Sequence, residues 1–207
     1  MIDIKTHESE FESSNYLEMG LAEAYPTIKW DKITYLDIGA GLPEFYSNSL
    51  HFRNKGAKVI SIDANPRFCQ LHIEAGYDIH NYAIVTDDRK EVTFTEYPGE
   101  IEGLAFSSIN EPIHGYYSIK HIVNSITINE FLKKYYKNIK KIDIIDLDIE
   151  GCELEIIQSL NLNKLGVKGM IVENLNNSND NYSVYETMGY FVYAKCAHND
   201  ILIKKQK

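Results

Sequence analysis

A short apolar run that stops at a pair of glycines is the feature that most constrains the fold of this chain. Residues 32–45 read K-I-T-Y-L-D-I-G-A-G-L-P-E-F, so a buried strand runs into a tight glycine turn. Pro43 predicts that a helix starts just after this turn. A second run, K-V-I-S-I-D-A-N-P at residues 58–66, ends on Asp63. Together they predict a strand-helix-strand unit, which binds nucleotide-like cofactors at the carboxyl ends of its strands.

The acids around the turn favour a cationic cofactor over a dinucleotide. A dinucleotide places its pyrophosphate at the helix N-terminus, where backbone N–H groups attract anions. Here Asp37 closes the strand, and Glu44 takes the place of the third glycine in the dinucleotide fingerprint. S-adenosylmethionine carries a positive ammonium and sulfonium, and Asp63 would accept hydrogen bonds from its ribose. The alternative is that Asp37 and Asp63 only cap the helices that follow them.

Length and charge are those of one ordinary globular domain. The chain has 207 residues, of which 44% are hydrophobic and 25% are charged. A net charge of -9 disfavours nucleic acid as a partner. The N-terminus lacks the features of a signal peptide, and no apolar run reaches the length of a membrane span. We therefore expect a cytoplasmic protein without membrane insertion.

Strand and helix patterns alternate along the rest of the chain. Further strands are expected at residues 78–85, 92–96, 125–128, 142–150, 169–173, 190–195 and 200–204, with helices at 8–25, 67–75, 152–160 and 182–188. The order predicts an α/β fold with a doubly wound, mostly parallel seven-stranded sheet and an antiparallel C-terminal hairpin. Within a single domain spanning 1–207, residues 1–30 would be a helical lead-in or a flap. Residues 98–124 would be a loop that lines the acceptor site.

Three acids alternate along the strand expected at residues 142–150. Asp146, Asp148 and Glu150 would share one face of that strand. Three like charges in a row are costly in a dry environment, so we expect them at the wet carboxyl end of the strand, in the reaction crevice. One of them would be a general base. The alternative is that Glu150 or Glu153 caps the next helix.

Several segments, in the same order and over nearly the whole chain from Thr34, resemble one family. They are D-I-G-A-G at 37–41, I-D-A-N-P at 62–66, Ser107-Ser108, S-I-T-I-N-E-F-L at 125–132, D-L-D-I-E-G-C-E at 146–153, I-V-E at 171–173 and H-N-D-I-L-I at 198–203. This pattern resembles the FkbM-type S-adenosylmethionine-dependent methyltransferases. The resemblance implies a Rossmann-like class I methyltransferase fold. It also implies methylation of a hydroxyl on a sugar, a nucleotide-sugar or a natural-product precursor, typically in polysaccharide biosynthesis.

The resemblance assigns a set of residues to the cofactor. These are Asp37, Gly39, Ala40, Gly41, Asp63, Ala64, Asn65, Asn81 and Asp146. Two positions depart from the family pattern. Gly41 and Pro43 replace an asparagine and a glycine, which would stiffen the turn but keep the N–H donors of Ala40 and Gly41. Asp146 stands where the family often has a lysine, which makes a mixed site acidic.

Other residues are candidates for catalysis and for acceptor binding. The catalytic candidates are Asp148, Glu150 and Glu173, and the acceptor-binding candidates are Ser107, His114, Tyr116 and Asn174. A loop histidine that only faces water would fit the pattern of His114 equally well. Asp148 and Glu173-Asn174 also resemble the magnesium ligands of related cation-dependent O-methyltransferases, so a divalent metal, magnesium or manganese, is a further hypothesis. Alternatively, Glu173 only orients the acceptor.

The expected function is therefore S-adenosylmethionine-dependent O-methylation of a small-molecule acceptor. N-methylation of a small amine by the same site is an alternative, since an acidic site attracts a protonated amine. Two alternatives come from other classes of protein: a nicotinamide-dependent oxidoreductase, and a module that binds S-adenosylmethionine without turnover. A homo-oligomer is compatible with the sequence.

Overall fold

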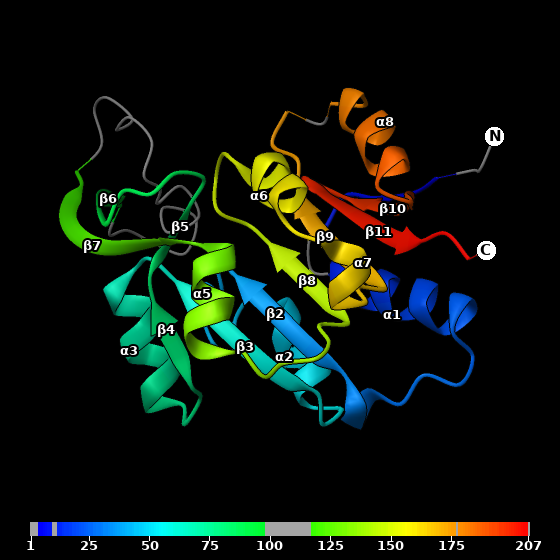
Figure 1. Ribbon diagram of the computed structural model, residues 1–207, viewed down its shortest axis with the longest axis horizontal. Helices are drawn as coiled ribbons and strands as arrows, with labels where there is room; N and C mark the ends of the chain where they lie inside the picture. Colours follow the sequence, from blue (N-terminus) through cyan, green and yellow to red (C-terminus); the bar gives the residue numbers. More distant parts are fainter. Residues whose placement is uncertain (1–3, 10–11, 98–116, 177, 207) are drawn as a thin grey trace.

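A computed structural model describes residues 4–9, 12–97, 117–176 and 178–206. Its main sheet has eight strands in the order β1-β10-β11-β9-β8-β2-β3-β4 (Figure 1). In chain order they are β1 (Lys5–His7), β2 (Thr34–Ile38), β3 (Lys58–Asp63), β4 (Ile79–Asn81), β8 (Ile144–Leu147), β9 (Gly169–Glu173), β10 (Tyr190–Cys196) and β11 (Asn199–Lys204). β11 runs antiparallel to β10 and β9, and the other neighbouring pairs are parallel. This confirms the predicted α/β fold with an antiparallel C-terminal hairpin.

The main sheet has one strand more than the expected seven because β1 pairs with β10. β1 reads K-T-H and is exposed along its length, so it carries no apolar signal and is held by backbone pairing. Residues 78–85 also differ from the single strand expected there. β4 stays in the main sheet beside β3, whereas the chain leaves that sheet at Tyr82 and continues as β5 (Ala83–Val85).

A second sheet has the order β5-β7-β6, with β6 at Glu91–Glu96 and β7 at Ile119–Thr127. β7 is parallel to β5 and antiparallel to β6. In Figure 1 the β6–β7 ribbon lies to one side of the main sheet, near the ends of β3 and β4. The loop expected at residues 98–124 therefore gives way to a strand at Ile119. Residues 98–116 lie outside the described residues.

Helices cover both faces of the main sheet, as a doubly wound fold requires (Figure 1). They are α1 (Ser13–Ala24), the 3-10 helix η2 (Trp30–Lys32), α2 (Asn48–Arg53), α3 (Pro66–Glu74), α5 (Ile128–Tyr135), α6 (Glu153–Ser159), α7 (Leu162–Leu165) and α8 (Asp180–Thr187). α1 buries Leu17 and Leu21 in a core that also contains Ile171 of β9 and Ile201 of β11. Among the described helices, none is both long enough and apolar enough to cross a membrane.

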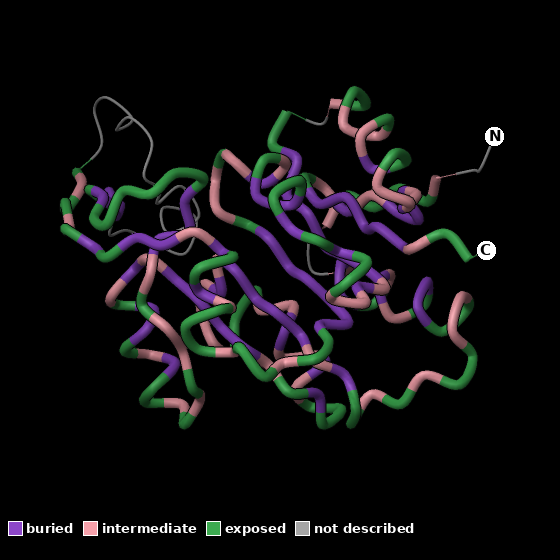
Figure 2. Tube along the Cα trace, viewed as in Figure 1, coloured by how far each residue is buried: buried purple, intermediate pink, exposed green. Residues whose placement is uncertain are grey.

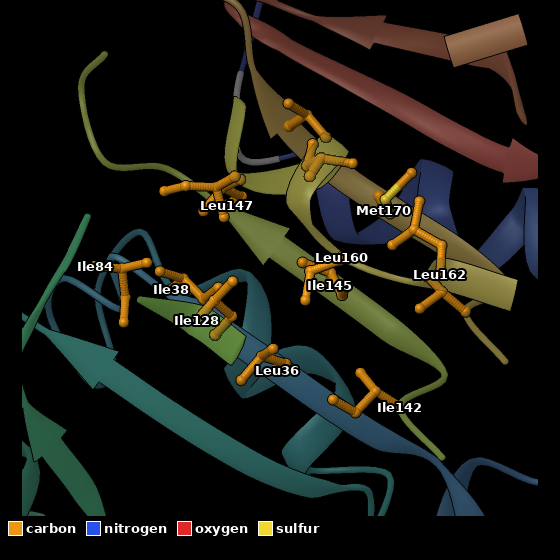
Figure 3. Close-up of a cluster of buried hydrophobic side chains, with 14 of the residues drawn as sticks. Leu36, Ile38, Ile84, Ile128, Ile142, Ile145, Leu147, Leu160, Leu162 and Met170 are labelled. Carbon is orange, nitrogen blue, oxygen red and sulfur yellow. The ribbon is translucent and has the colours of Figure 1, made fainter. Parts of the chain in front are cut away.

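The strands of the main sheet divide two hydrophobic cores between its faces. Leu36 and Ile38 of β2 join Ile145 and Leu147 of β8 in the larger core, which faces α5 and α6 (Figure 3). Tyr35 points to the opposite face, toward α1 and α2. Figure 2 shows that the buried residues are concentrated along these central strands. Each fully buried aliphatic side chain stabilises the fold by roughly 1.5–3 kcal/mol. The buried side chains of β2 and β8 therefore hold the carboxyl ends of these two strands in place.

Candidate active site

The carboxyl ends of β2 and β8 touch at a glycine. Gly39 follows β2 directly and has a φ angle of +82°. A Cβ added to Gly39 would overlap with the backbone carbonyl oxygen of Asp148, and the Asp148 N–H donates to the Ile38 carbonyl oxygen at 3.0 Å. Only glycine permits so close an approach at this φ angle. The turn after β2 and the turn after β8 therefore form one unit.

The helix that follows the turn starts later than Pro43 predicts. Residues 43–46 form bends, and α2 begins at Asn48 with Ser47 as its N-cap. The Ser47 Oγ accepts a hydrogen bond from the Leu50 N–H at 3.3 Å. Glu44 is exposed and does not lie in a first helical turn. The expectation that Glu44 disfavours a pyrophosphate at the helix N-terminus was therefore wrong.

The N–H groups of the glycine turn bind the protein itself. Those of Gly39 and Ala40 donate to the Ile62 carbonyl oxygen at 2.9 and 3.1 Å, and that of Gly41 donates to Asp63 Oδ2 at 2.8 Å. The turn therefore keeps the N–H donors of Ala40 and Gly41, and both donate within the protein. Gly41 still presents open space, because no described atom lies within 4 Å of a Cβ built on it.

Asp63 ties the glycine turn to the start of α3. Its Oδ1 accepts a hydrogen bond from the Asn65 N–H at 2.7 Å, and Asn65 is the N-cap of α3. The Asn81 side-chain amide donates to the carbonyl oxygens of Asp63 and Ala64, both at 3.0 Å. Burial raises the pKa of Asp63 to about 7, although the amides of Asn65 and Gly41 lower it. Asp63 thus joins the glycine turn to the N-cap of α3, and its contact with a ribose remains a prediction.

Asp37 and Asp146 stand opposite each other on β2 and β8, and only 4% and 5% of their surfaces are exposed. The Tyr35 hydroxyl donates to Asp146 Oδ2 at 2.8 Å. Among the described residues, nothing donates a hydrogen bond to Asp37 Oδ2 or to Asp146 Oδ1. Burial raises the pKa of Asp37 to about 6. Burial and the charge of Asp37 raise the pKa of Asp146 well above its usual range.

The three acids of the 146–150 segment do not share a wet face. β8 ends at Leu147, so Asp148 and Glu150 lie in the turn that follows, and Glu150 has a φ angle of +62°. Asp146 is buried inside the sheet, whereas Glu173 from the end of β9 joins the other two acids. Carboxylate oxygens of Asp148, Glu150 and Glu173 all lie within 4.8 Å of one another. The Glu150 N–H donates to Glu173 Oε2 at 3.2 Å.

Within this carboxylate cluster, Glu173 has a strongly raised pKa. Burial, followed by the charges of Asp148, Glu150 and Glu153, raises the pKa of Glu173 to about 10. Glu173 therefore carries a proton at neutral pH unless a cation is bound nearby. Glu153 braces the turn, because its Oε1 accepts hydrogen bonds from the N–H groups of Ile149 at 3.2 Å and Gly151 at 2.9 Å. These amides precede α6, so Glu153 holds the turn before the helix.

Of the acceptor-binding candidates, only Asn174 lies within the described residues. Asn174 is 5% exposed, and its side-chain amide donates to Asp200 Oδ2 at 2.8 Å and to the Ser178 carbonyl oxygen at 3.0 Å. Its Oδ1 accepts from the Ser178 N–H at 3.1 Å. Asn174 therefore shapes the loop after β9, and its contact with an acceptor stays a prediction. The remaining candidates, Ser107, His114 and Tyr116, lie outside the described residues.

The donor set of the site fits a cationic cofactor. Two buried carboxylate oxygens, Asp37 Oδ2 and Asp146 Oδ1, lack hydrogen-bond donors in the described part of the chain, as a site for an ammonium group would. The open space at Gly41 fits a ligand seated against the turn. The cluster of Asp148, Glu150 and Glu173 offers only oxygen ligands, which suit magnesium or manganese and also suit a protonated amine.

Sequence reasoning missed two residues that shape this site, Tyr35 and His72, and it considered Glu153 only as a helix cap. Tyr35 has the same strand parity as Asp37, so the alternation of β2 could have placed both on one face. His72 Nε2 lies 3.2 Å from the carbonyl oxygen of Gly41, a contact between residues 31 positions apart that the sequence does not signal.

Comparison with known proteins identifies the family. No curated protein matches the chain. The family model described as the methyltransferase FkbM domain matches residues 37–199, from the end of β2 to the start of β11. The matched segment contains the glycine turn, Asp63 and the carboxylate cluster. This chain therefore belongs to the FkbM family of S-adenosylmethionine-dependent methyltransferases.

Proposed function

We propose that this methyltransferase transfers the methyl group to a hydroxyl oxygen of a small acceptor. The acceptor class is a sugar, a nucleotide-sugar or a natural-product precursor, as in polysaccharide biosynthesis. The observation that carries the proposal is the cluster of Asp148, Glu150 and Glu173, which stands at the carboxyl ends of β8 and β9 and adjoins the Gly39 turn. A hydroxyl is a weak nucleophile until a base removes its proton, and this cluster supplies candidate bases.

The cofactor side of the proposal depends on β2, β3 and β4. When bound, S-adenosylmethionine supplies an electrophilic methyl carbon on its sulfonium. Asp37 and Asp146 would hold its ammonium group with their buried oxygens. Asp63, Ala64, Asn65 and Asn81 would border its adenosine, since they meet at the ends of β3 and β4. The Gly39–Gly41 turn would lie between these two groups of residues.

The carboxylates of the cluster would divide the work on the acceptor. Asp148 is exposed and Glu150 is partly exposed, so either would take the hydroxyl proton as the acceptor oxygen bonds to the methyl carbon and the bond from that carbon to sulfur breaks. Glu173 does not suit this role, because a pKa of about 10 keeps it protonated at neutral pH. Its proton would instead donate a hydrogen bond that orients the acceptor. Most of the rate enhancement would come from this positioning.

A protonated amine is the second candidate acceptor, and the same cluster favours it. Three carboxylates within 4.8 Å of one another attract a cation, which would also lower the raised pKa of Glu173. A divalent metal at these residues is the related proposal, in which magnesium or manganese lowers the pKa of an acceptor hydroxyl. Family membership sets aside the oxidoreductase and the non-catalytic binding module.

Product formation with a panel of acceptors tests the proposal. S-adenosylhomocysteine release would be measured with sugars, nucleotide-sugars and small amines, in the presence of magnesium, manganese or a chelator. We expect turnover with a hydroxyl acceptor and a loss of at least about a hundredfold in Asp148→Asn or Glu150→Gln, the size of a general-base effect. Asp31→Asn is the matched control, because Asp31 is exposed in η2 before β2.

The outcomes separate the candidates. Turnover with amines alone would replace the hydroxyl acceptor by the second candidate. Turnover that the chelator abolishes, and that magnesium or manganese restores, would support the metal proposal. Full activity in both Asp148→Asn and Glu150→Gln would contradict the assignment of the base to this cluster.

A further inference from the structure

Buried side chains hold Gly41 from both sides. On one side, its N–H donates to Asp63 Oδ2 at 2.8 Å. On the other, its carbonyl oxygen lies 3.2 Å from Nε2 of His72, which belongs to α3 and is 1% exposed. The two peptide groups that flank Gly41 are thus each tied to β3 or to the helix after it. Gly41 has a φ angle of +58°, a conformation that an unrestrained glycine would readily leave.

The contact with Gly41 defines the state of the His72 ring. A carbonyl oxygen only accepts hydrogen bonds, so His72 Nε2 must carry the proton and donate it. The other nitrogen, Nδ1, is buried without a hydrogen-bond partner among the described residues. Burial and the nearby Arg53 lower the pKa of His72, although the Gly41 carbonyl raises it. The ring is therefore a neutral imidazole in a single tautomer, with its one donor aimed at the turn.

We propose that His72 is a positioning residue for the cofactor turn. Through the Gly41 carbonyl it holds the turn in the shape that accepts S-adenosylmethionine, and the cofactor itself touches the turn and not the imidazole. The loss of this hydrogen bond would let the turn move and would require ordering when the cofactor binds, which weakens binding. The inference concerns the cofactor side of the site and is independent of the acceptor.

Three substitutions at His72 separate its hydrogen bond from its packing. His72→Gln places an amide near the position of Nε2 and keeps the donor. His72→Asn has the same chemistry but is one bond shorter, so its amide falls short of Gly41. His72→Leu fills the space without any donor. Leu71→Ala is the matched control, because Leu71 is the half-buried neighbour of His72 on α3.

Two measurements test the proposal: calorimetric titration with S-adenosylmethionine, and hydrogen exchange of residues 38–46 in the cofactor-free protein. One hydrogen bond is worth about 1.4 kcal/mol, so we expect about a tenfold weaker affinity in His72→Asn and His72→Leu. Exchange of the turn should be faster in both, and His72→Gln should restore both readouts. If His72→Leu fails to fold, the Gln and Asn pair still decides the question.

Two results would overturn the proposal. One is wild-type affinity and wild-type exchange in His72→Asn. The other is an equal loss in His72→Gln and Leu71→Ala, which would mean that His72 only packs.

Discussion

Gly39 lies so close to the carbonyl oxygen of Asp148 that a side chain at position 39 would overlap with it. This contact joins the cofactor turn after β2 to the first acid of the carboxylate cluster after β8. The Asp148 N–H reinforces it by donating to the Ile38 carbonyl oxygen at 3.0 Å. The two turns are therefore held together by backbone atoms alone.

Gly39→Ala should destabilise the fold strongly. A left-handed conformation costs an alanine about 1–2 kcal/mol, and relief of the overlap adds about 1–3 kcal/mol. Gly76→Ala is the control, because Gly76 has a similar φ angle of +80° but no described atom within 4 Å of an added Cβ. Urea denaturation should therefore show a larger loss in the free energy of unfolding for Gly39→Ala. Equal losses would contradict the close contact with Asp148.

The buried carboxyl of Asp37 should make stability depend on pH in a defined direction. Its pKa rises from 3.8 to about 6 in the fold, so the folded state favours the protonated form. Its stabilisation is complete below 3.8 and is lost as pH rises through about 6. The unfolding free energy of the wild type minus that of Asp37→Asn should therefore fall by up to about 3 kcal/mol as pH rises over this range. A difference that grows with pH would contradict this.

Tyr35→Phe should cost about 1–3 kcal/mol, because it leaves a buried oxygen of Asp146 without its donor. The double variant Tyr35→Phe/Asp146→Leu removes both polar partners and should lose less than the sum of the single variants. A double-mutant cycle of urea denaturation curves measures this coupling. Strictly additive losses would mean that the hydrogen bond contributes nothing to stability.

Glu173→Gln tests whether a cation belongs to the carboxylate cluster. Because Glu173 is protonated at neutral pH, an amide of the same shape should change the free energy of unfolding by less than about 1 kcal/mol. If magnesium binds the cluster, it should raise the melting temperature of the wild type but not that of Glu173→Gln. Thermal melts with and without magnesium measure this. An equal rise in both proteins would place the ion elsewhere.

Much of the sheet follows from local sequence. β2 and β3 are apolar runs that stop at a glycine or an acid, which is the pattern of buried parallel strands. β8 ends earlier than expected, because D-L-D-I-E alternates like a strand, whereas Glu150 adopts a φ angle of +62° that alternation does not reveal. β1 had no signal at all, since its three polar residues are held by pairing with β10.

The acids of the site could be recognised from sequence, but their partners could not. Tyr35 and Asp146 are 111 residues apart and meet only once the order of strands is known. The sequence therefore suggested that Asp146 lies beside Asp148. In the structure β8 ends at Leu147, so Asp146 is buried within the sheet and Asp148 lies in the turn after it. The contact of His72 with Gly41 depends in the same way on how α3 packs, which no local pattern encodes.

Calorimetric titration with S-adenosylmethionine tests the central claim most directly. The wild type should bind it, and Asp63→Ala should lose binding, because Asp63 holds both the Gly41 and the Asn65 amides. A nicotinamide dinucleotide should not bind either protein. Failure of the wild type to bind S-adenosylmethionine, or unchanged binding in Asp63→Ala, would contradict the assignment of the glycine turn and its acids to the cofactor.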